Sequence, residues 1–256
     1  MLKSAVLPIG GKGTRLKSFS DVPKLLTKLN KKPLIDYTLE RLVLEKINKV
    51  YIISNEHSKE VESYCAVRCK ELSIELVTLR ERVIKGNFGG IMENWERLPE
   101  EFIVVYPDVV WFCDTRKIYN YHSISQSLIT LVVRRSDHPF DSDTVKLSPL
   151  LNIKSIFSKV TKSREITYEK NDLFGATGIY LMNRKFLELA SKIEYKNTEL
   201  DLFECIEKIK VKENIQLTAF ISSQYIKDCG TPERFLRVSE DLKSNIIQSN
   251  FQKKQK

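Results

Sequence analysis

A glycine-rich loop follows the first apolar segment of the 256-residue chain, and its residue types suit phosphate binding. Residues 10–16 read Gly-Gly-Lys-Gly-Thr-Arg-Leu, and the glycines let the backbone turn sharply and present N–H groups to phosphate oxygens. The loop lacks the closing Gly-Lys-Ser/Thr of a Walker loop, and Arg15 and Leu16 interrupt a Rossmann G-x-G-x-x-G pattern. Lys12 and Arg15 add positive charge where a leaving pyrophosphate would need it. We interpret the loop as a phosphate cradle, with a plain glycine-rich turn as the alternative.

A lysine and two aspartates are candidates for the other charges of a phosphoryl-transfer site. Lys24 follows Pro23, which fixes the local backbone, and it could steady one of the reacting phosphates. Asp108 follows the apolar segment 102–106, and Asp228 comes just after a later predicted strand. Two carboxylates at sheet ends could share one Mg²⁺, which prefers carboxylate, water and phosphate oxygens. The alternative is that these aspartates are helix N-caps.

Short apolar segments alternate with amphipathic segments of helical period in the first half of the chain. The pattern predicts strands at 4–8, 49–54, 74–79 and 102–106 and helices at 34–44, 59–71 and 90–98. Strands separated by helices indicate a parallel sheet that is covered on both faces. Such sheets bind ligands at the carboxyl ends of their strands, so the loops that follow strands should carry the chemistry.

The pattern becomes β-rich after about residue 125. Strands are expected at 127–133, 144–147, 153–158, 178–182 and 216–221, and helices at 184–193, 200–209 and 232–242. We predict an α/β fold with a Rossmann-like, mixed but mostly parallel sheet flanked by helices, and a β-rich extension that supplies a second subsite. One domain would span residues 1–245, with halves 1–125 and 126–245, and residues 246–256 would form a flexible basic tail.

Composition narrows the partners. The formal charge of +9 suits an anionic ligand, but the chain lacks the interleaved aromatic and basic residues that stack nucleic-acid bases. No window approaches the ~18 apolar residues of a membrane span, and the start of the chain does not read as a signal peptide. The five cysteines include no C-x-x-C pair, which favours free thiols in a reducing compartment. We therefore expect a cytoplasmic protein that binds neither nucleic acid nor membrane.

The motifs together resemble the sugar-phosphate nucleotidyltransferase family over nearly the whole chain. The family's G-G-x-G-T-R-L loop is matched by residues 10–16, its P-K by Pro23 and Lys24, its K-P-L-I by residues 32–35 and its D-x-G-T-P-E by residues 228–233. Segments 20–24, 138–143 and 227–234 look most like the branch of heptose 1-phosphate and mannose-1-phosphate guanylyltransferases. The resemblance implies the nucleotide-diphospho-sugar transferase type of fold.

The resemblance also implies residue roles. Arg15 would polarise the β- and γ-phosphates, Lys24 would neutralise the α-phosphate, and Asp108 and Asp228 would hold Mg²⁺. The nucleotide-binding residues implied by the match are Gly10, Gly11, Lys12, Gly13, Thr14, Gly86 and Asn87. The sugar-phosphate residues are Lys159, Gly178 and Glu199.

The function that follows is transfer of a nucleotidyl group, with GTP expected as donor, to a manno-heptose or mannose 1-phosphate, releasing pyrophosphate. The chain departs from the family pattern at Pro107, where a small residue is usual, and at Asn87, where a threonine is usual. The alternatives are CTP, UTP or dTTP with another hexose 1-phosphate, and a regulatory homologue that binds a nucleotide sugar without turnover. A homo-oligomer is possible, and the sequence leaves the oligomeric state open.

Overall fold

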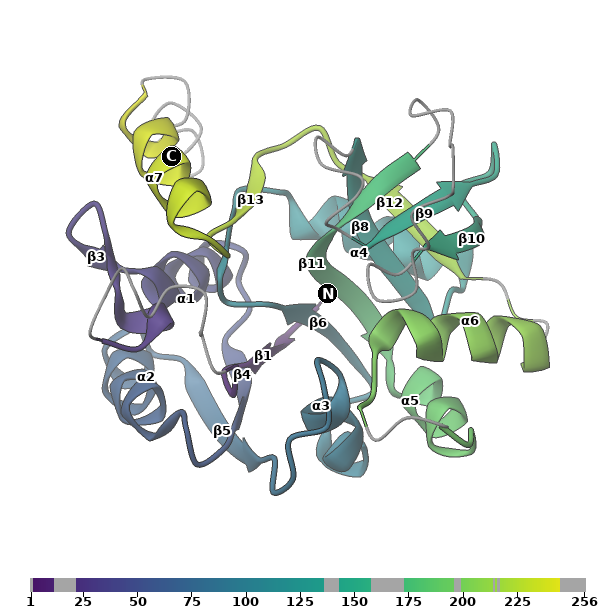
Figure 1. The fold of residues 1–256 in the computed structure, drawn as a ribbon, viewed down its shortest axis with the longest axis horizontal. Coiled ribbons are helices and arrows are strands. Elements are labelled where there is room, and N and C mark those ends of the chain that lie inside the picture. The colour runs from purple at the N-terminus through teal and green to yellow at the C-terminus, as the bar shows by residue number, and fades with distance from the viewer. Residues whose placement is uncertain are drawn as a thin grey trace.

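The computed structural model describes residues 2–11, 22–135, 143–157, 173–195, 199–213, 215 and 217–244. Within these residues, a nine-stranded sheet occupies the centre of the molecule (Figure 1). Its main path runs in the order β10-β9-β11-β6-β1-β4-β5, and β8 and β12 extend it from β11. The sheet is mixed, as predicted, and helices flank it.

The first half of the chain builds the parallel part of the sheet. β1 (Ser4–Pro8) lies between β4 (Lys49–Ser54) and β6 (Glu101–Val105), and β5 (Glu75–Arg80) adds to the far side of β4. The helices of this half are α1 (Leu34–Leu44), α2 (Lys59–Glu71) and the short α3 (Gly89–Glu93). Because these four strands are parallel, their carboxyl ends meet at one edge of the sheet. The predicted strands of this half agree with the structure to within one residue.

The second half adds antiparallel strands to the same sheet. The long β11 (Leu173–Asn183) pairs antiparallel with β6, with β8 (Ile129–Arg135) and with β9 (Thr144–Leu147). β10 (Ile153–Phe157) pairs with β9, and β12 (Thr218–Ile221) pairs in parallel with β8. β11 begins five residues before the predicted strand 178–182, and its register shifts around Gly178, whose φ is +79°. This irregularity bends the strand beside β6.

Several shorter elements connect these strands. Two of them are the 3₁₀ turns η2 (Lys24–Leu26) and η3 (Trp95–Arg97). Two are short strand pairs: β2 (Lys28–Leu29) with β3 (Lys32–Pro33), and β7 (Val109–Trp111) with β13 (Ile226–Asp228). The remaining helices are α4 (Thr115–Ser125), α5 (Arg184–Ser191), α6 (Leu202–Glu213) and α7 (Pro232–Lys243).

The helix predicted at 90–98 is wrong in length. α3 ends before Asn94, whose side-chain amide donates to the carbonyls of Gly90 and Arg80, each at 2.9 Å.

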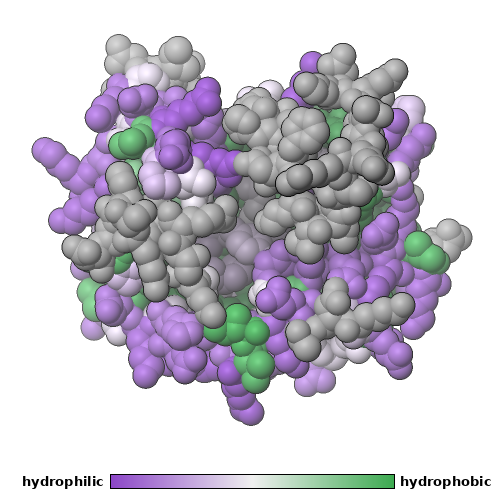
Figure 2. All heavy atoms as spheres, in the orientation of Figure 1, coloured by the Kyte–Doolittle hydropathy of each residue, from purple (hydrophilic) through white to green (hydrophobic). Residues whose placement is uncertain are grey.

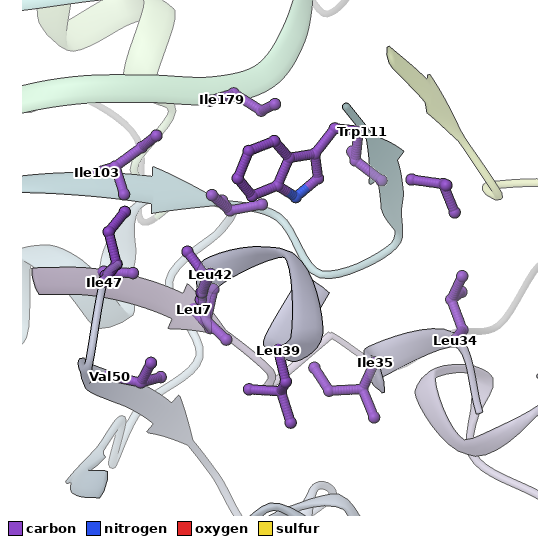
Figure 3. Close-up of a cluster of buried hydrophobic side chains, with 14 of the residues drawn as sticks. Leu7, Leu34, Ile35, Leu39, Leu42, Ile47, Val50, Ile103, Trp111 and Ile179 are labelled. Carbon is purple, nitrogen blue, oxygen red and sulfur yellow. The ribbon is translucent and has the colours of Figure 1, made fainter. Parts of the chain in front are cut away.

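Alternation along the strands sends successive side chains into two hydrophobic clusters, one on each face of the sheet. Leu7 and Ile103 belong to one cluster, with residues of α1 and α2, whereas Val6 and Val104 belong to the other, with residues of α3, α5 and α6. Figure 3 shows the first cluster, in which side chains from β1, β6 and α1 converge with Trp111. The apolar faces of these helices are therefore buried, and they fix α1 against the strands that lead into the site.

Candidate active site

The carboxyl ends of β1, β4 and β5 form one wall of the site. Gly10 follows β1, and its carbonyl accepts a 2.8 Å hydrogen bond from Asn55 Nδ2, just beyond β4. Asn55 is itself fixed, because its backbone N–H donates to Ser58 Oγ at 2.8 Å. Glu81, directly after β5, lies behind this pair with its Oε2 3.5 Å from Asn55 Nδ2. The start of the glycine-rich loop therefore rests on a buried polar platform.

The residue Glu81 is buried, with only 9% of its surface exposed. Burial raises its pKa, and hydrogen bonds from the Lys85 N–H and from Asn55 oppose that rise. A carboxylate in this position presents two acceptor oxygens, one beside Gly10 of the loop after β1 and one beside Gly89 at the end of the loop after β5. Neither Asn55 nor Glu81 was predicted from the sequence. Asn55 directly follows the predicted strand 49–54 and Glu81 lies two residues after the predicted strand 74–79, and those positions were the available signal.

Part of the predicted site cannot be placed. Lys12, Gly13, Thr14, Arg15 and Lys159 lie outside the described residues. Gly11 is described, and a Cβ built there meets no atom within 4 Å, so this residue faces open space. In the orientation of Figure 1, the space-filling view shows a hollow near the centre of the molecule (Figure 2).

The predicted cation and the first predicted metal ligand are in direct contact. Lys24 lies in η2, which follows Pro23 and is anchored by the buried Leu25. Its Nζ lies 2.5 Å from Asp108 Oδ2, and the side chains are 14% and 28% exposed, respectively. Asp108 follows β6 after Tyr106 and Pro107, at the same edge of the sheet as Gly10. Residues 84 positions apart are thus brought together as one charge pair.

Asp228 reaches the same place from the other end of the chain. It pairs with Val109 across β13 and β7, and the following N–H of Cys229 donates to the Asp108 carbonyl at 2.8 Å. Its carboxylate accepts from the Gly230 N–H at 3.0 Å and from Arg234 at 3.1 Å. The alternative that Asp228 caps a helix is wrong. Thr231 caps α7 instead, by accepting from the Arg234 N–H.

The donor set fits a hard divalent cation. Asp108 and Asp228 supply carboxylate oxygens from adjacent backbones, and Mg²⁺ takes one or two carboxylates plus water and phosphate oxygens. Among the described residues there is no group of three or more acidic, histidine or cysteine side chains that could hold a metal alone. Substrate phosphates would therefore have to complete the coordination of an ion held here.

A second wall is formed by the loop after β5 and the loop before α6. Gly86 has a φ of +78°, and a Cβ there would lie 2.7 Å from the Leu200 carbonyl, so only glycine fits. Asn87 follows it, and its side chain points to Asp201, with Nδ2 2.7 Å from Oδ2. Glu199 is in the same loop before α6 and is exposed. The structure thus brings the predicted nucleotide residues Gly86 and Asn87 next to the predicted sugar residue Glu199.

Tyr106 connects Gly178 of β11 to Asn87 of the loop after β5. The Tyr106 N–H donates to the Gly178 carbonyl at 2.9 Å, and the Tyr106 hydroxyl donates to the Asn87 carbonyl at 2.7 Å. Burial raises the Tyr106 pKa, and the carboxylates of Asp201 and Asp108 add to the rise. Tyr106 therefore keeps its proton and acts as a donor. Sequence analysis did not single out Tyr106 or Asp201, because neither belongs to a glycine-rich or charged motif.

The family is shown by a match over almost the whole chain. The family model described as "Nucleotidyl transferase" matches residues 4–245, so the chain belongs to this family. Its curated relatives include several sugar-1-phosphate nucleotidyltransferases, and the protein is an enzyme of this kind. The predicted family and enzyme class are confirmed.

Individual relatives and solved structures are consistent with this family. The chain is 25% identical over 251 residues to a D-glycero-alpha-D-manno-heptose 1-phosphate guanylyltransferase of Aneurinibacillus thermoaerophilus, covering 94% of this chain and 99% of that one. Among solved structures, it resembles the UDP-glucose pyrophosphorylase of Acinetobacter baumanii with a TM-score of 0.76 and 20% identity, covering 99% of this chain and 98% of that one. It also resembles HddC of Yersinia pseudotuberculosis in complex with GMP-PN, with a TM-score of 0.71, 19% identity and coverage of 94% and 100%. The structural likenesses confirm the predicted fold class.

Over the described part of the chain, every helix is too short or too polar to span a membrane.

Proposed function

We propose that this enzyme transfers a guanylyl group from GTP to a manno-configured sugar 1-phosphate, giving a GDP-sugar and pyrophosphate. The sugar phosphate oxygen attacks the α-phosphorus of the nucleotide in line. A new P–O bond forms as the bond to the β-phosphate bridging oxygen breaks, and that oxygen leaves with the electron pair as part of pyrophosphate. The attacking group is already an anion, so no protein nucleophile is required, and catalysis rests on positioning and charge neutralisation.

The observation that carries this proposal is the contact of Lys24 with Asp108 beside Asp228. The backbone of Asp228 lies beside that of Asp108, because the Cys229 N–H donates to the Asp108 carbonyl at 2.8 Å and Asp228 pairs with Val109. Lys24 can donate to an α-phosphate oxygen, and the two aspartates can hold Mg²⁺, which when bound would neutralise charge on both phosphates. Arg15 and Lys12 of the glycine-rich loop are proposed to receive the β- and γ-phosphates, with Gly10, Gly11, Gly13 and Thr14 supplying backbone N–H groups.

Glu81 supports the choice of guanine. The Watson–Crick edge of guanine offers two adjacent donors, N1–H and the N2 amino group, and a carboxylate can accept from both. Uracil and thymine instead offer one donor between two carbonyl oxygens, which a carboxylate would repel. Glu81 Oε2 lies 3.5 Å from Asn55 Nδ2, which holds the Gly10 carbonyl, so its oxygens sit beside the start of the nucleotide loop.

The relatives support the same choice of base and sugar. The guanylyltransferase of Aneurinibacillus thermoaerophilus is named for a manno-configured heptose 1-phosphate. The competing proposal is uridylyl transfer, because a structural neighbour is a UDP-glucose pyrophosphorylase. Glu199 and Lys159 are proposed to contact the sugar hydroxyls and its phosphate.

The test is pyrophosphate release with Mg²⁺ for GTP, ATP, CTP, UTP and dTTP, each against heptose, mannose, glucose and glucosamine 1-phosphates. The proposal expects the highest kcat/KM with GTP and a manno-configured sugar. Turnover with another pair would keep the reaction and overturn the substrate assignment. If no pair of substrates released pyrophosphate and the protein still bound a nucleotide sugar, the result would indicate a regulatory homologue instead.

A single substitution tests the role of Glu81 within that grid. Glu81→Gln keeps the side-chain size but offers one acceptor and one donor, which suits uracil or thymine better than guanine. We expect kcat/KM for GTP to fall about tenfold or more, and the ratio of UTP to GTP use to rise. An unchanged ratio would remove Glu81 from base selection.

We also propose a cytoplasmic location. All five cysteines are buried thiols rather than disulfides, as expected in a reducing compartment.

A further inference from the structure

The loop that follows β5 and the loop that precedes α6 are joined by main-chain hydrogen bonds. The Leu200 N–H donates to the Lys85 carbonyl at 2.8 Å, and the Phe88 N–H donates to the Leu200 carbonyl at 3.1 Å. The first loop belongs to the nucleotide half and carries Gly86, and the second belongs to the sugar half and carries Glu199. A short ladder therefore crosses between the two proposed substrate subsites.

Asn87 extends this ladder with its side chain. Its Nδ2 donates to Asp201 Oδ2 at 2.7 Å, and its Oδ1 accepts from the Leu202 N–H at 3.1 Å. Asp201 uses its other oxygen, Oδ1, to accept from the N–H groups of Phe203 and Glu204 at 2.9 and 3.1 Å. Both polar ends of the Asn87 side chain thus engage the start of α6.

Asn87 is also bonded to the segment that follows β6 and carries the proposed metal ligand Asp108. The Tyr106 hydroxyl donates to the Asn87 carbonyl at 2.7 Å, and Tyr106 lies two residues before Asp108. Asn87 is therefore the point at which the nucleotide loop, the sugar loop and the strand that carries Asp108 meet. A hydrogen bond between an amide and a carboxylate is charge-assisted and stronger than a neutral one.

We propose that Asn87 is a positioning residue that fixes the Glu199 loop for the sugar phosphate, rather than a side chain that binds nucleotide. This inference rests on the proposed function. The main-chain ladder keeps the nucleotide loop in place when the side chain is lost, whereas the start of α6 loses its link to that loop. Loss of the side chain should therefore weaken sugar phosphate binding much more than nucleotide binding.

The first measurement separates the two Michaelis constants. For Asn87→Ala we expect the KM of the sugar phosphate, at saturating nucleotide, to rise about tenfold or more, because a charge-assisted hydrogen bond is lost. The KM of the nucleotide should change less than about twofold. An unchanged sugar phosphate KM, or a larger effect on the nucleotide, would overturn the proposal.

A charge exchange provides the rescue. Asn87→Asp places two carboxylates against each other, so it should be worse than Asn87→Ala. Adding Asp201→Asn restores the pair with donor and acceptor reversed: the new residue 87 still accepts from the Leu202 N–H, and the new residue 201 still caps α6. The double variant should recover the sugar phosphate KM to within about threefold of wild type. A double variant no better than Asn87→Asp would contradict the pairing.

Amide hydrogen exchange tests the link without any substrate. In Asn87→Ala the Leu202 amide should exchange faster than in wild type, and the double variant should restore its protection. Unchanged exchange would overturn the proposal whatever the substrate is. Absence of turnover by the wild-type enzyme on every substrate pair, with exchange altered as expected, would instead refute the proposed function alone.

Discussion

The Lys24 ammonium lies 2.5 Å from Asp108 Oδ2, so without substrate the predicted catalytic cation neutralises the predicted metal ligand. A divalent cation that binds Asp108 must displace Lys24 or share the carboxylate oxygens of Asp108 with it. Lys24 would then be released toward the phosphate that arrives with the metal. The pair thus links metal binding to the placement of the catalytic cation.

Lys24→Met should therefore tighten metal binding while it slows catalysis. The pair is partly exposed, so its loss is worth at most ~1 kcal/mol, and we expect Mn²⁺ to bind the substrate-free variant about two- to fivefold more tightly. Electron paramagnetic resonance titration of free Mn²⁺ measures this. Lys227→Met is the matched control, because Lys227 pairs with Asp241 at 2.6 Å rather than with Asp108. Equal Mn²⁺ affinities for the two variants would contradict direct competition.

Gly178→Ala should destabilise the fold. Gly178 has a φ of +79°, and an added Cβ would lie 3.2 Å from Val109 Cγ2 and 3.4 Å from Tyr106 Cβ. The left-handed conformation alone costs ~1–2 kcal/mol with a side chain, which predicts a fall in Tm of about 2–8 °C. Gly11→Ala is the control, since a Cβ there meets open space and Gly11 has no positive φ. Calorimetry that found the same Tm for both variants would refute the strain at Gly178.

The buried Glu81 carboxyl should make stability fall as pH rises. Burial raises its folded pKa above the ordinary value of 4.5, so the folded state holds a proton that the unfolded state has lost. Stability is therefore lost as pH rises from 4.5 through the folded pKa. Glu81→Gln removes this titration, so the Tm of the variant relative to wild type should increase with pH across that window. A difference that stays constant with pH would show that Glu81 does not titrate there.

The sheet could be predicted because its strands are short apolar runs between amphipathic helices. β1 and β4 match their predicted bounds, and their side chains alternate between two clusters as the strand period requires. α4 was missed, since it is mostly polar and its N-terminus is marked chiefly by Asp114, which accepts from the Arg116 N–H at 3.0 Å. A single capping side chain is a weak signal without a strong apolar period.

Candidate site residues could be selected from the sequence where they belong to local motifs. They could not be selected where their role depends on a contact with a residue far away in the sequence. Lys24, Asp108 and Asp228 were selected from the sequence. In the structure Lys24 contacts Asp108 and Asp228 pairs with Val109, and the roles of the three residues stay predictions. The contact of Asn87 with Asp201 joins residues 114 positions apart, and local spacing carries no information about such a pair. The arrangement arises only when the sheet brings the two loops together.

Asp108 and Asp228 are the proposed metal ligands, so the decisive measurement is pyrophosphate release by Asp228→Asn under saturating substrates and Mg²⁺. Asp241→Asn is the control, because Asp241 carries the same charge but binds Lys227 and Tyr225. We predict that Asp228→Asn lowers kcat by about 10²–10³-fold or more with its Tm retained, while Asp241→Asn stays within about threefold of wild type. Wild-type turnover by Asp228→Asn would contradict the assignment of Asp108 and Asp228 as the metal-binding pair.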